Sequence, residues 1–224
     1  MINDLALLRL LQLISPGLPI GMYSYSQGLE RAIDDGLVTN ADDVHEWLEG
    51  LLVHGMTQLD LPVMARLFDA WTLADNVAVV QWSKTLIACR ETSELRAEDR
   101  QTGQALARLL VALELDEAAE WLRKPEATLA TLFSLAAVRW AIPKREAAIG
   151  YLWSWLENQV LCAVKLVPLG QVAGQRLLMA LASRLPEQVN RALLLADDEI
   201  GSSVFGLALV SSRHETQYSR LFRS

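Results

Sequence analysis

The stretch of the chain that most limits its possible fold runs from residue 146 to 170 and reads EAAIGYLWSWLENQVLCAVKLVPLG. Apolar side chains recur on every side of a helix drawn through this stretch. A helix that is apolar almost all round is normally buried on all sides. Pro168 and Gly170 end it, because proline donates no helical hydrogen bond and glycine readily adopts the left-handed conformation. We therefore predict a central helix with the remaining helices packed around it.

Two charged residues, Glu157 and Lys165, interrupt this apolar helix. Burying either charge without a partner would be strongly unfavourable. Two interpretations follow from the sequence. Either the charges are paired or reach solvent at their ends, or they come to the surface at a contact site for another protein.

The rest of the chain also favours helices over strands. Of its 224 residues 52% are hydrophobic, and these are mainly Ala and Leu, not the Val and Ile that strands prefer. One sizeable domain accounts for this length. We predict an all-α, single-domain helical bundle at residues 1–211, with a Pro/Gly-rich N-terminal loop, followed by a flexible C-terminal tail at residues 212–224.

Composition and charge exclude several classes of protein. The net charge of −7 argues against a nucleic-acid binder, and we find no apolar run long enough for a membrane span. Asp4 stands where a secretory signal would carry positive charge. Cys89 and Cys162 lie far apart in apolar helical sequence, as expected of buried thiols in a cytoplasmic protein.

Patterning along the chain predicts most of the helices. Leu5, Leu8, Leu11 and Leu13 indicate an amphipathic first helix that ends before Pro16. Further helices are expected over 41–54, 61–73, 76–110 with a break near Glu91, 128–141, 171–185 and 187–196, and residues 200–210 fit a helix or a short strand. The polar sequence 89–104 has the spacing of exposed ion pairs and is interpreted as a solvated face.

The loop SPGLPIGMYSYSQGLE, residues 15–30, is the first candidate contact segment. It places Tyr23, Ser24, Tyr25 and Ser26 next to one another, and such aromatic rings and hydroxyls are common at protein interfaces. The alternative is a Pro/Gly turn whose tyrosines cap the core.

The last 13 residues, SRHETQYSRLFRS, form the second candidate contact segment. They carry a formal charge of +2, whereas the rest of the chain carries −9. Tyr218 and Phe222 would share one face of a helix, and aromatic and Arg residues together are typical of interface hot spots. The alternative is a disordered, solubilising end.

The sequence lacks the local motifs of common active sites. It has no glycine-rich phosphate loop and no nucleophile elbow. His45 and His54 are nine positions apart, which does not place two metal ligands on one helix face. We therefore expect no catalytic residue, no cofactor and no metal site. An unrecognised helical enzyme that uses Glu30, Tyr23 or Tyr25 stays open as an alternative.

Together the two contact segments, the central stretch YLWSWLENQVLCAVKLVPLGQ and the middle sequence CRETSELRAEDRQTGQALARLL resemble the UreF family of urease accessory proteins in order and spacing. Only details such as Gly17 and Met22 depart from the expected pattern. The resemblance implies a non-enzymatic, cytoplasmic, all-helical protein that helps to insert nickel into apo-urease.

The implied partners are a UreD-like protein, called UreH in some systems, a UreG-like GTPase whose GTP hydrolysis it regulates, and apo-urease; a homodimer is also compatible. Direct nickel binding through His45, His54 or His214 is the alternative role. The tail residues expected to become ordered on the UreD-like partner are Arg213, His214, Glu215, Gln217, Tyr218, Arg220, Phe222 and Arg223. The residues assigned to the GTPase-facing surface are Tyr23, Ser24, Tyr25, Ser26, Glu30 and Lys165.

Overall fold

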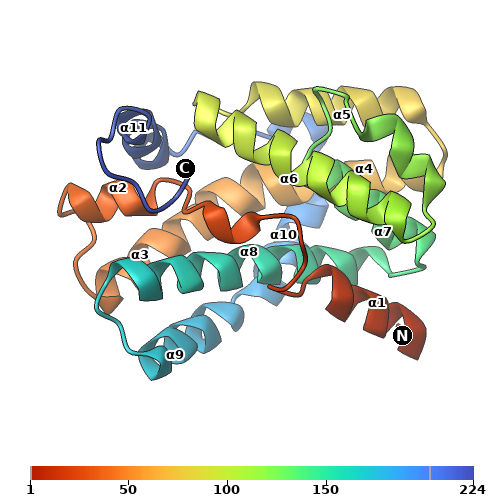
Figure 1. The fold of residues 1–224 in the computed structure, drawn as a ribbon. Coiled ribbons are helices and arrows are strands. Elements are labelled where there is room, and N and C mark those ends of the chain that lie inside the picture. Colours follow the sequence, from red (N-terminus) through yellow and green to blue (C-terminus); the bar gives the residue numbers. More distant parts are fainter. Residues whose placement is uncertain (1, 202) are drawn as a thin grey trace.

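A computed structural model describes residues 2–201 and 203–224. The apolar stretch forms helix α8, Lys144–Leu166, which begins after Pro143 and ends just before Pro168. It runs through the middle of the bundle (Figure 1), and its buried side chains point to several sides. Because Leu161 is 37% exposed, α8 is not buried all round as the sequence predicted. The helices that contact α8 are α1, α2, α3, α4, α7, α9 and α10.

The other helices pack around α8 in the order given by the chain. Those before it are α1 (Asp4–Leu13), α2 (Leu29–Asp34), α3 (Ala41–Gly50), α4 (Leu61–Thr72), α5 (Asn76–Ala88), α6 (Ser93–Ala112) and α7 (Leu129–Arg139). Those after it are α9 (Gln171–Ala182), α10 (Leu185–Leu194) and α11 (Phe205–His214). The short helical segments are η1 (Met22–Ser24), η2 (Leu51–Asp60), η3 (Asp116–Trp121) and η4 (Asp197–Glu199).

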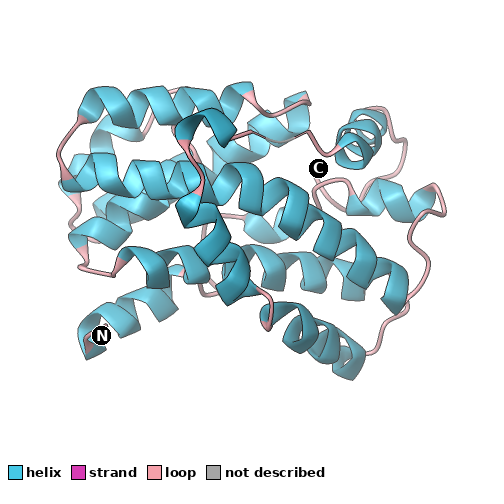
Figure 2. Ribbon diagram, turned by 180° about the vertical axis from the view of Figure 1, so that it is seen from behind, coloured by secondary structure: helices cyan, strands magenta, loops and turns pink. Residues whose placement is uncertain are grey.

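The all-α prediction is confirmed, because the described residues contain no strand (Figure 2). The predicted break near Glu91 separates α5 from α6, and the Thr92 hydroxyl caps α6 by accepting the Leu95 N–H at 3.3 Å. Residues 205–210 are helical and belong to α11, so the strand alternative is wrong there. Residue 202 of that stretch lies outside the described residues. None of the described helices combines the length and apolar character needed to cross a membrane.

Helices α3 and α4 are joined without a loop, because η2 between them is a π-helix. Pro62, in the first turn of α4, has no N–H with which to bond the carbonyl of Gln58. That carbonyl instead accepts the Gly201 N–H at 3.0 Å. The wider turns of η2 thus direct a main-chain acceptor to the segment that precedes α11.

Helix α1 packs on α8 mainly through a face other than the one the leucine pattern suggested, since of Leu5, Leu8, Leu11 and Leu13 only Leu13 is buried. Its buried residues are Ala6, Leu10 and Leu13, and Gly150 of α8 gives Leu10 room, since a Cβ there would lie 2.6 Å from Leu10 Cδ1. Leu5 and Leu8 are 66% and 62% exposed. Leucine occurs on both faces of this helix, so its spacing alone did not identify the buried one.

Candidate functional site

Residues 212–224, which we call the C-terminal segment, lie against the N-terminal loop, α2 and α6 (Figure 1). Helix α11 supplies the first three of them, so the boundary expected at residue 211 falls inside a helix. The sequence predicted a flexible tail. The structure instead places the segment on the body of the protein, because the buried carboxylate of Glu30 binds its main chain and Glu94 and Glu98 bind its side chains.

Glu30, at the start of α2, is the central anchor of the C-terminal segment. Its carboxylate accepts the Leu221 N–H at 2.7 Å and the Phe222 N–H at 2.9 Å. Hydrogen bonds to an ionised carboxylate are about twice as strong as neutral ones. Glu30 is only 8% exposed. A residue that the sequence assigned to a partner-facing surface thus binds another part of its own chain.

His214, the last residue of α11, lies between two carboxylates. Its Nε2 is 3.3 Å from Glu30 and its Nδ1 is 2.7 Å from Glu94, which also accepts a hydrogen bond from Arg220 at 2.7 Å. Each ring nitrogen thus faces a carboxylate, and the donor and acceptor roles depend on the tautomer of the ring. The ring is completely buried, and neither nitrogen is directed to solvent or to an open metal site.

Ser224 joins the end of the segment to the N-terminal loop. Its main-chain oxygen accepts hydrogen bonds from the Ser26 N–H at 2.9 Å and the Ser26 hydroxyl at 2.5 Å. The Ser224 hydroxyl donates to Glu98 of α6 at 3.0 Å, and Gln27 donates to the other Glu98 oxygen at 2.8 Å. Burial raises the pKa of Glu98 to about 7, although these hydrogen bonds oppose the shift.

Tyr25 connects the N-terminal loop to both α6 and α8. Its hydroxyl donates to Gln101 at 2.6 Å, and Arg223 donates to the same Gln101 oxygen at 3.2 Å. The main-chain oxygen of Tyr25 accepts from Asn158 at 3.0 Å and from the Cys162 thiol at 3.5 Å. Burial raises the pKa of the Tyr25 hydroxyl, and that of the Cys162 thiol to about 12.

Lys165 lies near the end of α8 and is exposed. Its ammonium is 5.7 Å from the centre of the Phe222 ring, a distance within the range of a cation–π contact. Phe222 itself is 4% exposed. Lys165 and the C-terminal segment, which the sequence assigned to two different partner surfaces, are therefore neighbours.

The remaining predicted residues are mostly exposed. Tyr218 is fully exposed and Tyr23 is 63% exposed. Glu215 accepts hydrogen bonds from the Ser93 hydroxyl and N–H, which lower its pKa. The other contacts in this group are Arg213 with Asp35 at 3.1 Å, Gln217 with the Ser219 carbonyl at 3.1 Å, and the Ser24 carbonyl with the Arg223 N–H at 2.8 Å.

The sequence reasoning missed the part that α6 plays in this site. Glu94, Glu98 and Gln101 are spaced by four and three residues, so they share one helix face, and all three bind the C-terminal segment. This spacing was a usable signal, because it gives one face a row of hydrogen-bond acceptors.

The interpretation of residues 89–104 as a solvated face is wrong at Arg90. This residue lies between α5 and α6, and its guanidinium is 2.5 Å from Asp60 and 2.6 Å from Asp99. Burial alone would lower the pKa of Arg90, but the two carboxylates hold it well above its usual value. This buried ion cluster joins η2 to α6 beneath the candidate site.

Within residues 2–201 and 203–224, no three His, Cys, Asp or Glu side chains are grouped in a way that would hold a metal ion. The side chains that the site leaves exposed include the aromatic rings of Tyr23 and Tyr218 and the cationic groups of Lys165 and Arg220, and such side chains are typical of protein-binding surfaces. Fold and site together define an all-helical protein whose C-terminal segment leaves aromatic and cationic side chains exposed.

Comparison with known proteins identifies the family. The UreF family model matches residues 38–182. The chain is 58% identical to the urease accessory protein UreF of Alkalilimnicola ehrlichii over 220 residues, which cover 98% of this chain and 96% of that protein. It is 48% identical to UreF of Hahella chejuensis, with 98% and 99% covered, and 50% identical to UreF of Alcanivorax borkumensis, with 99% and 100% covered. The chain belongs to the UreF family of urease accessory proteins.

Proposed function

We propose that this protein is a non-catalytic scaffold for the insertion of nickel into apo-urease in the cytoplasm. With a UreD-like protein, it recruits a UreG-like GTPase and regulates its GTP hydrolysis. The observation that carries this proposal is the similarity to UreF proteins over nearly the full length of the chain. The nickel and the nucleotide are then bound mainly by the partners.

The C-terminal segment is our candidate for the UreD-like contact. Its exposed side chains, above all Tyr218 and Arg220, offer an aromatic ring and a guanidinium to a partner. Tyr23 and Lys165 are the exposed candidates for contact with the GTPase. Glu30, Ser26, Tyr25 and His214 would act indirectly, by positioning the segment and the loop.

Co-expression with UreD-like and UreG-like proteins and apo-urease tests the proposal. We expect a complex that gel filtration with light scattering resolves, GTP hydrolysis that differs from that of the GTPase alone, and nickel in urease only when this protein is present. A chain that elutes alone under every nucleotide condition contradicts the proposal. Stoichiometric nickel binding by the isolated chain, lost on replacing a histidine, would favour the direct nickel chaperone.

A matched pair of variants separates contact with a partner from folding of the segment. Tyr218→Ala removes a fully exposed ring and should weaken co-purification with the UreD-like protein without changing the melting temperature. Phe222→Ala removes a buried ring and should lower both the co-purification with the UreD-like protein and the melting temperature. Normal complex formation by Tyr218→Ala would show that Tyr218 is not part of the contact.

A further inference from the structure

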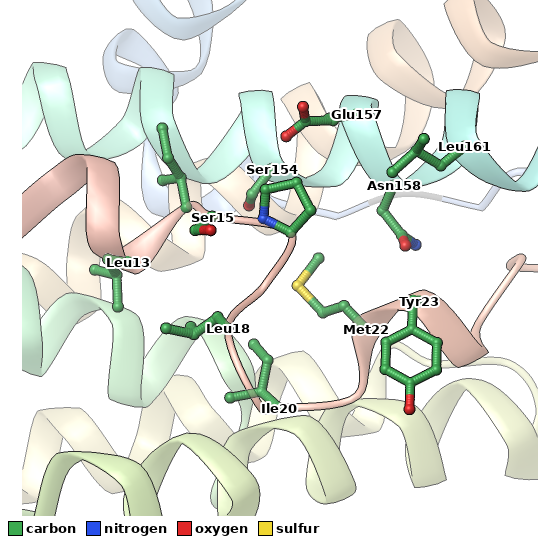
Figure 3. A pocket seen from close by; sticks show the side chains of 12 residues that line it. Leu13, Ser15, Leu18, Ile20, Met22, Tyr23, Ser154, Glu157, Asn158 and Leu161 are labelled. Carbon is green, nitrogen blue, oxygen red and sulfur yellow. The ribbon is translucent and has the colours of Figure 1, made fainter. Parts of the chain in front are cut away.

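A pocket lies between α8 and the residues that lead from α1 to η1, beside the C-terminal site. It is a small cavity of about 40 Å³ that opens to solvent. Figure 3 shows the loop residues Leu18, Ile20 and Met22 opposite the α8 residues Glu157 and Asn158. None of the contacts of the C-terminal segment described above involves the side chains of these residues.

The two sides of this pocket differ in chemistry. The loop side is mainly apolar, with hydroxyls only at Ser15 and Tyr23. The α8 side offers the Ser154 hydroxyl, the Glu157 carboxylate and the Asn158 amide. Among the described residues that line the pocket, none is a lysine, an arginine or a histidine. A ligand that fits both sides has an apolar stem and a positively charged end.

Glu157 is the residue of the α8 side that most favours a positively charged ligand. It is half-buried, and no described residue forms an ion pair with it. Burial raises the pKa of its carboxyl, and a hydrogen bond from Trp153 opposes this only in part. A carboxylate held in apolar surroundings without a cation is unfavourable, and an incoming cation would offset this cost.

We propose that this pocket binds one lysine or arginine side chain presented by another polypeptide. The aliphatic stem packs against Leu18, Ile20 and Met22, and the charged end pairs with Glu157. Long basic side chains commonly cover apolar surface in this way while their charged ends remain in contact with polar groups. A polypeptide is the expected source because the rim carries Tyr23, which is 63% exposed, and Leu161, which is 37% exposed. These two side chains would contact the residues that flank the basic one. The inference does not depend on the role in nickel insertion.

The test uses Nα-acetyl-lysine N-methylamide and the matching norleucine derivative, which has a similar stem without the charge. Each is titrated into the full chain, and backbone amide shifts are followed by NMR. We expect saturable shifts at Leu18, Glu157 and Asn158 with the lysine probe, and binding of the norleucine probe weaker by about tenfold, the effect of one partly buried ion pair. The arginine derivative should behave like lysine.

Variants show whether Glu157 is the cause of this preference. Glu157→Gln keeps the shape and should bind the lysine and norleucine probes equally. Glu120→Gln changes an exposed carboxylate in η3, far from the lining residues in sequence, and should leave the preference intact. Equal binding of the two probes by the native chain, a lysine preference that survives Glu157→Gln, or the absence of saturable shifts at the lining residues would overturn the proposal. Self-association of the chain that the lysine probe reverses would identify a second copy of this chain as the polypeptide that supplies the basic side chain.

Discussion

The core around α8 and the contact of the C-terminal segment with the N-terminal loop are held by different forces. In the core, Leu132, Leu135 and Leu156 are completely buried, and apolar packing dominates. At the C-terminal segment, the carboxylates of Glu30 and Glu98 accept hydrogen bonds from main-chain N–H groups and side chains of distant parts of the chain. Only Phe222 adds a large buried apolar group there.

This difference predicts that the two regions open independently. Apolar burial scales with area and holds the core as one cooperative unit. A single hydrogen bond contributes only about 0.5–1.5 kcal/mol net, and about 1.5–3 kcal/mol when one partner is charged. The C-terminal segment should therefore detach before the core unfolds. Four substitutions test this expectation, and their expected effects on stability decrease from Leu156→Ala to Lys165→Ala.

Leu156→Ala should act on the core. The side chain is completely buried on α8, and its removal leaves a cavity, so we expect a loss of about 2–5 kcal/mol in the free energy of unfolding. Urea unfolding followed by circular dichroism measures it. A loss of stability confined to the C-terminal segment would show that the core and this segment do not open independently. Leu194→Ala, at an 85% exposed position, is the matched control.

Glu30→Gln should act on the C-terminal segment. An uncharged amide accepts less strongly and turns an NH2 group toward one of the two N–H donors, so we expect local opening to become easier by about 1.5–3 kcal/mol. Hydrogen exchange at the Leu221 and Phe222 amides should accelerate, while core amides keep their protection. Unchanged exchange at these two amides would contradict the role of Glu30 as anchor.

Glu98→Gln should change the dependence of stability on pH. The folded pKa of about 7 lies above the ordinary value of 4.5, so the folded state binds the proton more tightly. The resulting stability is complete below about pH 4.5 and is lost as the pH rises through 7. Allowing for partial exposure, we expect the native chain to lose about 1–2 kcal/mol over this range and the variant to lose less. Melting temperatures from pH 5 to 8 check this, and parallel curves would refute it.

Lys165→Ala should have the smallest effect on stability. The cation–π contact with Phe222 is exposed on the lysine side and is worth about 0.5–1 kcal/mol. The melting temperature should change little, whereas recruitment of the GTPase or its rate of GTP hydrolysis should change if the proposed surface is correct. A large drop in melting temperature would instead indicate a structural role for Lys165.

The sequence predicted the fold well because its strongest signals were local. The apolar surface of α8, the stop at Pro168 and the break near Glu91 all depend on neighbouring residues, and the structure confirms them. The structure also brings the two candidate contact segments together, and their contact with other proteins stays a prediction.

The roles of individual residues were harder to predict, because they depend on partners far away in the chain. Glu30 contacts Phe222, which is 192 positions away, and His214 contacts Glu94, which is 120 positions away. No local pattern distinguishes a carboxylate that binds a distant main chain from one that faces solvent. The alternation of leucines in α1 failed for a related reason, since both of its faces are apolar.

The hydrogen bonds between Ser26 and Ser224 also have a consequence for the synthesis of the chain. The two residues are 198 positions apart, and ribosomes add about 5–20 residues per second. The N-terminal loop is therefore synthesised about 10–40 s before the residues that complete it. Until then, Glu30 and Tyr25 have not met their partners from residues 212–224. The synthesis of residues 212–224, rather than that of the N-terminal loop, decides when this surface takes its final form.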